Sequence, residues 1–177
     1  MKSQICRVMA VALLSATVGA QAANPISQAI RDEWNGVKSN LQRSATAMPE
    51  AKFGFKPVDT VRTYGQILAH VAGANYIFCS AARGEKSPFA EDAFEKTATT
   101  RAAILKAVED SVKYCDAAYA ALDDRKAAEM IDGAFGSGKT ARAAALMGNS
   151  GHVQEHYGNL VTYMRINGVV PPSSQPK

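Results

Sequence analysis

Apolar residues recur every three or four positions over residues 105–122, and this spacing constrains the fold more than any other feature of the sequence. Successive members of the series are 3, 4, 3, 4 and 3 residues apart, which places them on one face of an α-helix. The apolar stripe consists of Leu105, Val108, Val112, Cys115, Tyr119 and Leu122. No stretch of the chain alternates convincingly with a period of two, and there is no internal repeat. The pattern therefore predicts an all-α fold.

Two further helices are predicted in the first half of the chain. The first spans Pro25–Ala47, because Asn24 is a typical N-cap residue and proline suits the first helical position. The second spans Tyr64–Ala82. It is preceded by Thr63, which forms the sequence pattern of a capping box with Gln66.

A fourth helix is predicted from Thr140 to Asn167, where Gly168 is a natural residue to end it. The connection over residues 83–96 is long for a plain helical hairpin and suits a crossover between the two ends of a bundle. Residues 125–139 are less regular. These features together predict a four-helix bundle with a long connection between its second and third helices.

The N-terminus has the pattern of a secretion signal. Two basic residues are followed by an apolar run from Val8 to Val18, and Ala20-Gln21-Ala22 forms a small-residue cleavage pattern. We expect residues 1–22 to be a signal peptide, residues 23–177 to be one domain, and the protein to be periplasmic or secreted. The apolar run is too short to span a bilayer, so we expect no stable membrane anchor.

The charge balance argues against nucleic acid as a partner. The chain has 20 Lys and Arg residues, and loss of Lys2 and Arg7 with the signal leaves 18 of them against 16 acidic residues. The remaining basic residues are scattered and form no stripe with interleaved aromatics. We expect a small-molecule substrate or ligand, and the chain is also compatible with a homodimer.

The predicted domain keeps two cysteines, Cys79 and Cys115, whose state the sequence leaves open. An exported protein meets an oxidising compartment, where cysteines pair. If the crossover makes the second and third helices parallel, the two residues fall at similar depths, which favours a disulfide. The alternative is two small buried hydrophobic residues on separate helices.

The chain contains only three histidines, and two of them are four residues apart in the predicted fourth helix. His152 and His156 therefore lie on the same helical face, where two imidazoles can hold one metal ion. His70, on the second helix, can complete the site from across the bundle. Three such ligands leave an open position for water or substrate, as in catalytic metal sites. The alternative is that the histidines are structural and bind no metal.

Helical geometry also predicts the neighbours of this site. Asn149 lies three residues before His152 and Asn159 three residues after His156, so both are expected to orient a ligand or a bound water. Glu155 is expected at the surface, because it does not stand in an H-E-x-x-H arrangement. No nucleophile–histidine–acid grouping is evident, and the sequence identifies no catalytic residue.

The segment Gly133–Thr140 matches the phosphate-binding pattern G-x-x-x-x-G-K-T letter for letter. A phosphate-binding loop follows a buried strand, whereas residues 125–132 are charged and rich in alanine. No parallel strand–helix pattern surrounds the segment. We therefore interpret it as a flexible glycine-rich segment leading into the fourth helix, with the region around Thr140 as the cap.

Three segments resemble the DinB-like (DinB/YfiT) superfamily of four-helix-bundle proteins. They are Gln66–Val71 around His70, His152–Asn159, and Asn167–Pro172 at the end of the fourth helix. The resemblance covers most of residues 25–172. It implies an up-down-down-up bundle in which His70, His152 and His156 hold a divalent metal ion, Zn²⁺ or Ni²⁺.

The resemblance also indicates which chemistry to expect. Some members of the superfamily are thiol-dependent S-transferases, others are described only as metal-dependent hydrolases, and many have no known activity. Taken with the predicted signal peptide, it implies an exported metal-dependent enzyme of the hydrolase or thiol S-transferase type. The alternative is a helical bundle that binds a metal or a small ligand without turnover.

Overall fold

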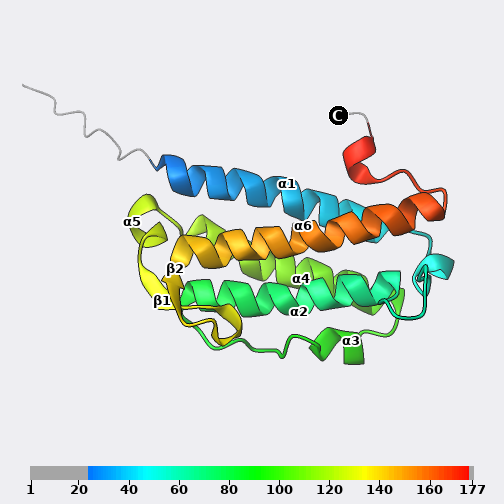
Figure 1. Cartoon of the computed structure of the whole chain (residues 1–177), viewed down its shortest axis with the longest axis horizontal. Coiled ribbons are helices and arrows are strands. Elements are labelled where there is room, and N and C mark those ends of the chain that lie inside the picture. Colours follow the sequence, from blue (N-terminus) through cyan, green and yellow to red (C-terminus); the bar gives the residue numbers. More distant parts are fainter. Residues whose placement is uncertain (1–23, 176–177) are drawn as a thin grey trace, which may run out of the picture.

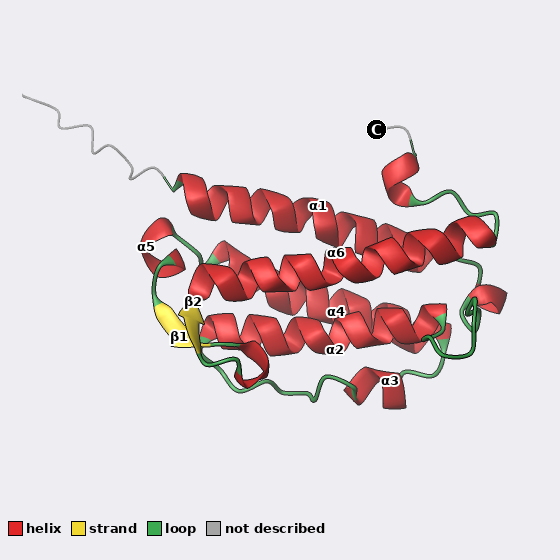
Figure 2. Ribbon diagram, viewed as in Figure 1, coloured by secondary structure: helices red, strands yellow, loops and turns green. Residues whose placement is uncertain are grey.

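The structure, a computed structural model, describes residues 24–175 of the chain. In this range four long helices pack together, and shorter elements occupy the connections between them (Figures 1 and 2). The long helices are α1 (Pro25–Ala47), α2 (Tyr64–Arg83), α4 (Arg101–Ala120) and α6 (Arg142–Ile166). The short elements are α3 (Ala93–Thr97), α5 (Asp124–Ala127), β1 (Met130–Asp132), β2 (Lys139–Ala141) and the 3-10 turns η1 (Glu50–Lys52), η2 (Ala134–Gly136) and η3 (Pro172–Ser174).

The helical class predicted from the sequence is confirmed, since the four predicted helices correspond to α1, α2, α4 and α6. Among the helices of residues 24–175, none combines the length and apolar character that a membrane span requires. The predicted signal peptide, residues 1–22, lies outside the described residues.

The start of the fourth long helix differs from the prediction. Thr140 lies in β2, which pairs antiparallel with β1, and it does not cap the helix. Gly136 and Gly138 have φ values of 70° and 85°, a left-handed conformation that lets the chain reverse within a few residues. α6 therefore begins only at Arg142. The segment that matches a phosphate-binding loop forms the turn and the start of the second strand of a β-hairpin, and the strand before it, β1, is antiparallel to β2.

Two helix N-termini are capped in different ways. At α2 the predicted capping box is present: Gln66 N donates to the Thr63 hydroxyl, and Thr63 N donates to the Gln66 side chain. At α1, Asn24 makes no side-chain cap. Instead the carboxylate of Asp124, at the start of α5, accepts from Ser27 N at 2.7 Å. An acidic group stabilises a helix N-terminus because the first N–H groups there are unpaired and carry partial positive charge.

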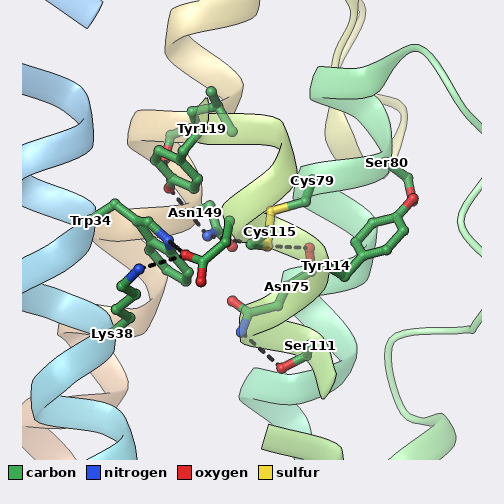
Figure 3. Close-up of a disulfide and its surroundings, with 12 residues drawn as sticks. Trp34, Lys38, Asn75, Cys79, Ser80, Ser111, Tyr114, Cys115, Tyr119 and Asn149 are labelled. Atoms are coloured by element: carbon green, nitrogen blue, oxygen red, sulfur yellow. Dashed lines mark hydrogen bonds and ion pairs between the residues drawn. A yellow bond between two sulfur atoms is a disulfide. The ribbon is translucent and has the colours of Figure 1, made fainter. Parts of the chain in front are cut away.

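Helices α2 and α4 pack in register and run in the same direction. Asn75 of α2 donates to the hydroxyl of Ser111, and four residues further along both helices Cys79 is joined to Cys115 by a disulfide (Figure 3). Pairing that advances equally on both helices requires that they be parallel. The connection between them, which contains α3, runs along the outside of α2 back to the end where α2 began (Figure 1).

An aromatic stack links three of the long helices (Figure 3). Trp34 of α1 lies parallel to Tyr119 of α4, with ring centroids 4.7 Å apart. The indole N–H donates to Asp116, which also pairs with Lys38 at 2.7 Å. The Tyr119 hydroxyl donates to the carbonyl of Leu146 on α6 at 2.7 Å. Each buried polar atom of the stack therefore has a partner, which offsets the cost of its burial.

We expect the Cys79→Ala/Cys115→Ala double variant to lose about 3–4 kcal/mol of unfolding free energy, because the disulfide closes a long loop in the unfolded chain. Urea denaturation without reductant measures the loss. The reduced wild-type protein is the control and should approach the stability of the double variant. Two reactive thiols in denatured, unreduced wild-type protein would contradict the disulfide itself.

Candidate metal centre

The three histidines come together between α2 and α6. His70 projects from α2, and His152 and His156 project from consecutive turns of α6. The Nε2 atom of His152 lies 3.2 Å from Nε2 of His70 and 3.2 Å from Nε2 of His156. The candidate ligand atoms all lie within 4.8 Å of one another. The fold thus gathers at one point residues that are 82 positions apart in the sequence.

Two of the three spacings between these nitrogen atoms fit a single divalent cation. Imidazole nitrogens bound at about 2.1 Å to one tetrahedral ion lie roughly 3.4 Å apart. The two measured spacings of 3.2 Å are close to that value. Three facing nitrogens cannot all satisfy one another, since one N–H donates well to only one acceptor. A central cation would accept all three lone pairs and keep an open position.

Burial keeps the two α6 histidines in the form that binds metal. Burial, together with the neighbouring His156 and His70, lowers the pKa of His152 to about 4. The pKa of His156 is also lowered, first by burial and then by His70. Metal ions bind the neutral imidazole, so protons compete weakly for these two side chains near neutral pH.

The two asparagines expected at the site have different surroundings. Asn159 places its side-chain nitrogen 3.4 Å from Nδ1 of His156, where the amide can orient the imidazole ring. The amide of Asn149 instead donates to the Tyr119 hydroxyl at 3.2 Å and lies 3.8 Å from the sulfur of Cys115. Asn149 therefore makes its hydrogen bonds with α4, unlike the sequence-based expectation. The reason is that its turn of α6 faces the core.

Two charged residues that the sequence did not single out complete the surroundings of His70. Glu95, on α3, places one carboxylate oxygen 3.2 Å from Nδ1 of His70. Arg62, just before α2, donates to both oxygens of Glu95, at 2.9 and 3.3 Å. Arg62 lies in a loop and α3 has only 5 residues, too few to show a periodicity that would indicate which way the Glu95 side chain points. Glu155, by contrast, is exposed as expected.

An aromatic pair borders the histidines on the side of the hairpin. The ring of Phe78 lies 5.8 Å from the ring of His152 and 5.1 Å from the ring of Phe135, at the hairpin tip. Phe135 has a φ of 55°, the only positive φ at a non-glycine residue in the part of the chain that the structure describes. This contact could not be predicted from the sequence, because it depends on the fold of the glycine-rich segment.

A helical bundle with three histidines converging from two helices is the architecture expected of the DinB superfamily. A model of this superfamily matches residues 33–160, a segment that includes all three histidines. The chain therefore belongs to the DinB superfamily. No curated protein matches its sequence.

Solved structures share the fold at low sequence identity. A DinB-like protein from Bacillus cereus ATCC 10987 is 16% identical with a TM-score of 0.65, over 82% of this chain and 95% of that one. A mycothiol-dependent maleylpyruvate isomerase is 19% identical with a TM-score of 0.62, over 76% of this chain and 60% of the isomerase. A conserved protein from Enterococcus faecalis is 13% identical with a TM-score of 0.62, over 79% of this chain and 95% of that one. At these identities the likeness shows the fold alone.

The lowered pKa of His152 predicts that the metal-free protein loses stability as the pH falls from about 6.5 towards 4. In this window the unfolded chain binds a proton at His152 that the folded chain does not, so acid favours unfolding. Urea denaturation at several pH values, with a chelator present, measures the slope. His152→Gln removes the titrating group and should flatten that part of the profile. Equal slopes for both proteins would contradict the prediction.

Proposed function

We propose that this chain is an exported metal-dependent enzyme of the DinB type, of the hydrolase or thiol S-transferase class, with His70, His152 and His156 as the ligands of one divalent ion, Zn²⁺ or Ni²⁺. The observation that carries the proposal is the convergence of three Nε2 atoms, two of its spacings being 3.2 Å. When bound, such an ion lowers the pKa of a coordinated water or thiol, or polarises a carbonyl group.

A pocket beside the histidines supports a small-molecule substrate. It has a volume of about 670 Å³ and includes His156 in its wall. Polar groups of Arg62, Gln66 and Asn159 line it and can hydrogen-bond a ligand, while Ile67 offers an apolar contact. A concave site with a few converging polar groups next to a metal centre is typical of substrate pockets.

The cysteines bear on the choice between the two reaction classes. Cys79 and Cys115 are joined in a disulfide and are fully buried, so neither offers a free thiol to a substrate. A thiol transfer would therefore take its sulfur from a small-molecule thiol bound in the pocket. A hydrolysis would use a water in the open position.

We further propose that the four long helices form an up-down-down-up bundle. We also propose that the protein is located in an oxidising compartment. The parallel pairing of α2 with α4 supports this order. So does the contact of Phe78, two turns beyond His70, with His152 rather than with the later turns of α6. The disulfide supports a periplasmic or secreted location, where such bonds persist.

One observation favours a bundle that binds metal without turnover as the second candidate. The carboxylate of Glu95 is engaged by both His70 and Arg62, and that of Glu91 lies 3.8 Å from the same imidazole. The Glu95 carboxylate is therefore not free to act as a general base towards a substrate in the pocket, whereas that of Glu91 is 44% exposed and makes no short contact with the ring.

We expect residues 23–177, purified without a histidine tag, to hold about one divalent ion per chain, as a site with three protein ligands should. Elemental analysis measures the content. His156→Ala should lose the ion, because only two of the three imidazole ligands remain to bind it. Gln154→Ala, an exposed neighbour on the same helix, is the matched control and should keep it. Wild-type protein without metal even after reconstitution would refute the metal centre.

A substrate screen separates the enzyme from the binder. We expect the metal-loaded protein to turn over either esters and amides or a thiol-plus-electrophile pair, and His152→Ala to fall to the background rate. Gln154→Ala should retain the activity. Stoichiometric metal with no turnover of any of these substrates would favour the non-catalytic alternative.

A further inference from the structure

The connection between α2 and α4 lies directly against the backbone of α2, one turn beyond His70. The contact is made at Gly73, where an added Cβ atom would lie 1.9 Å from the carbonyl oxygen of Glu91. Real Cβ atoms do not approach other atoms so closely, so no other residue fits without moving the connection. Gly73 is three positions after His70 and shares its helical face. Gly73 therefore fixes the position along α2 at which the connection passes the metal centre.

At this level along α2, the connection places a carboxylate beside Nδ1 of His70. One oxygen of Glu95 lies 3.2 Å from Nδ1, while Nε2 of the same ring points at His152. The Glu95 side chain is 18% exposed and that of His70 6% exposed, so the contact is largely shielded from water. A carboxylate only accepts, so the proton of His70 is held on Nδ1 and the lone pair of Nε2 faces the other histidines.

Arg62 holds this carboxylate in place. Its guanidinium donates to both oxygens of Glu95, a two-pronged contact that fixes the plane of the carboxylate. Its own carbonyl accepts from the Tyr163 hydroxyl of α6 at 3.0 Å. The chain of contacts thus begins on α6, passes through Arg62 and Glu95, and ends on the α2 ligand. It links the two helices that supply the three histidines.

We propose that Glu95 is a positioning residue that fixes the tautomer and the ring orientation of His70 for metal binding. In this arrangement Arg62 orients the Glu95 carboxylate, and Gly73 allows the connection to pack against the backbone of α2. The inference rests on the metal centre of the proposed function. Glu91 does not share this role, since its carboxylate lies 3.8 Å from Nδ1 and its side chain is 44% exposed.

The test compares five variants by their affinity for Zn²⁺, measured by competition with a chromophoric chelator. Glu95→Ala and Gly73→Ala should each weaken binding about 10- to 100-fold, the range typical of a lost carboxylate partner of a ligating histidine, while two controls should change it by about twofold or less. The controls are Glu91→Ala and Gly36→Ala, the latter at a helical glycine with nothing within 4 Å of an added Cβ. Glu95→Gln keeps an acceptor of the same reach and should recover part of the affinity.

A second readout does not depend on metal. In the apo protein, NMR of the imidazole nitrogens should find His70 protonated at Nδ1 in the wild type and in a mixture of tautomers in Glu95→Ala. A purely structural role of Glu95 would lower the melting temperature without moving this signal. This measurement also serves if Gly73→Ala fails to fold.

The outcomes separate this inference from the proposed function. Full metal affinity and an unchanged His70 tautomer in Glu95→Ala would overturn the positioning role while the metal centre stands. Wild-type protein that binds no Zn²⁺ would overturn both. Weakened binding in Glu91→Ala equal to that in Glu95→Ala would also count against Glu95 as the specific partner.

Discussion

The burial of α2 on nearly every side is the constraint on which the rest of the structure depends. α4 covers one face, α6 another, and the α3 connection lies along a third. A polar side chain in such a helix must find a partner, because burial without one is costly. Asn75 pairs with Ser111, Ser80 pairs with Tyr114, and His70 pairs with Glu95 and His152. The histidine cluster is thus one of several polar contacts that fix how the neighbours of α2 are placed.

The sequence predicted those parts of the molecule that depend on local patterns. Helix α1, the capping box at Thr63 and the shared face of His152 and His156 follow from spacing and side-chain chemistry alone. The hairpin escaped prediction because strands of three residues are too short to alternate visibly. The role of Glu95 was not predicted because its contact with His70 depends on how the connection crosses α2. Such information is not encoded in any periodicity of the connection itself.

Membership of the DinB superfamily and the geometry of the site bear on different questions. Solved relatives at 13–19% identity share the fold, so the arrangement of helices tolerates replacement of most side chains. The histidine site and its support involve few positions: the three histidines, the Glu95 carboxylate beside one of them, and the disulfide one helix turn beyond Asn75. The disulfide fixes α2 against α4, while the histidines connect α2 to α6. Helix α2 therefore contributes both to the placement of the candidate ligands and to the stability of the bundle.

The wide sequence separation of the histidines has a consequence for how the protein matures. His70 and His152 are 82 positions apart, whereas the cysteines are separated by 36. A chain made from its N-terminus can pair α2 with α4 before α6 exists, but the three nitrogens meet only after α6 has docked. Capture of the proposed metal ion would then be coupled to the last step of assembly, because an ion that binds only the native site stabilises the native state. A bound ion would then indicate that α6 has docked against the other long helices.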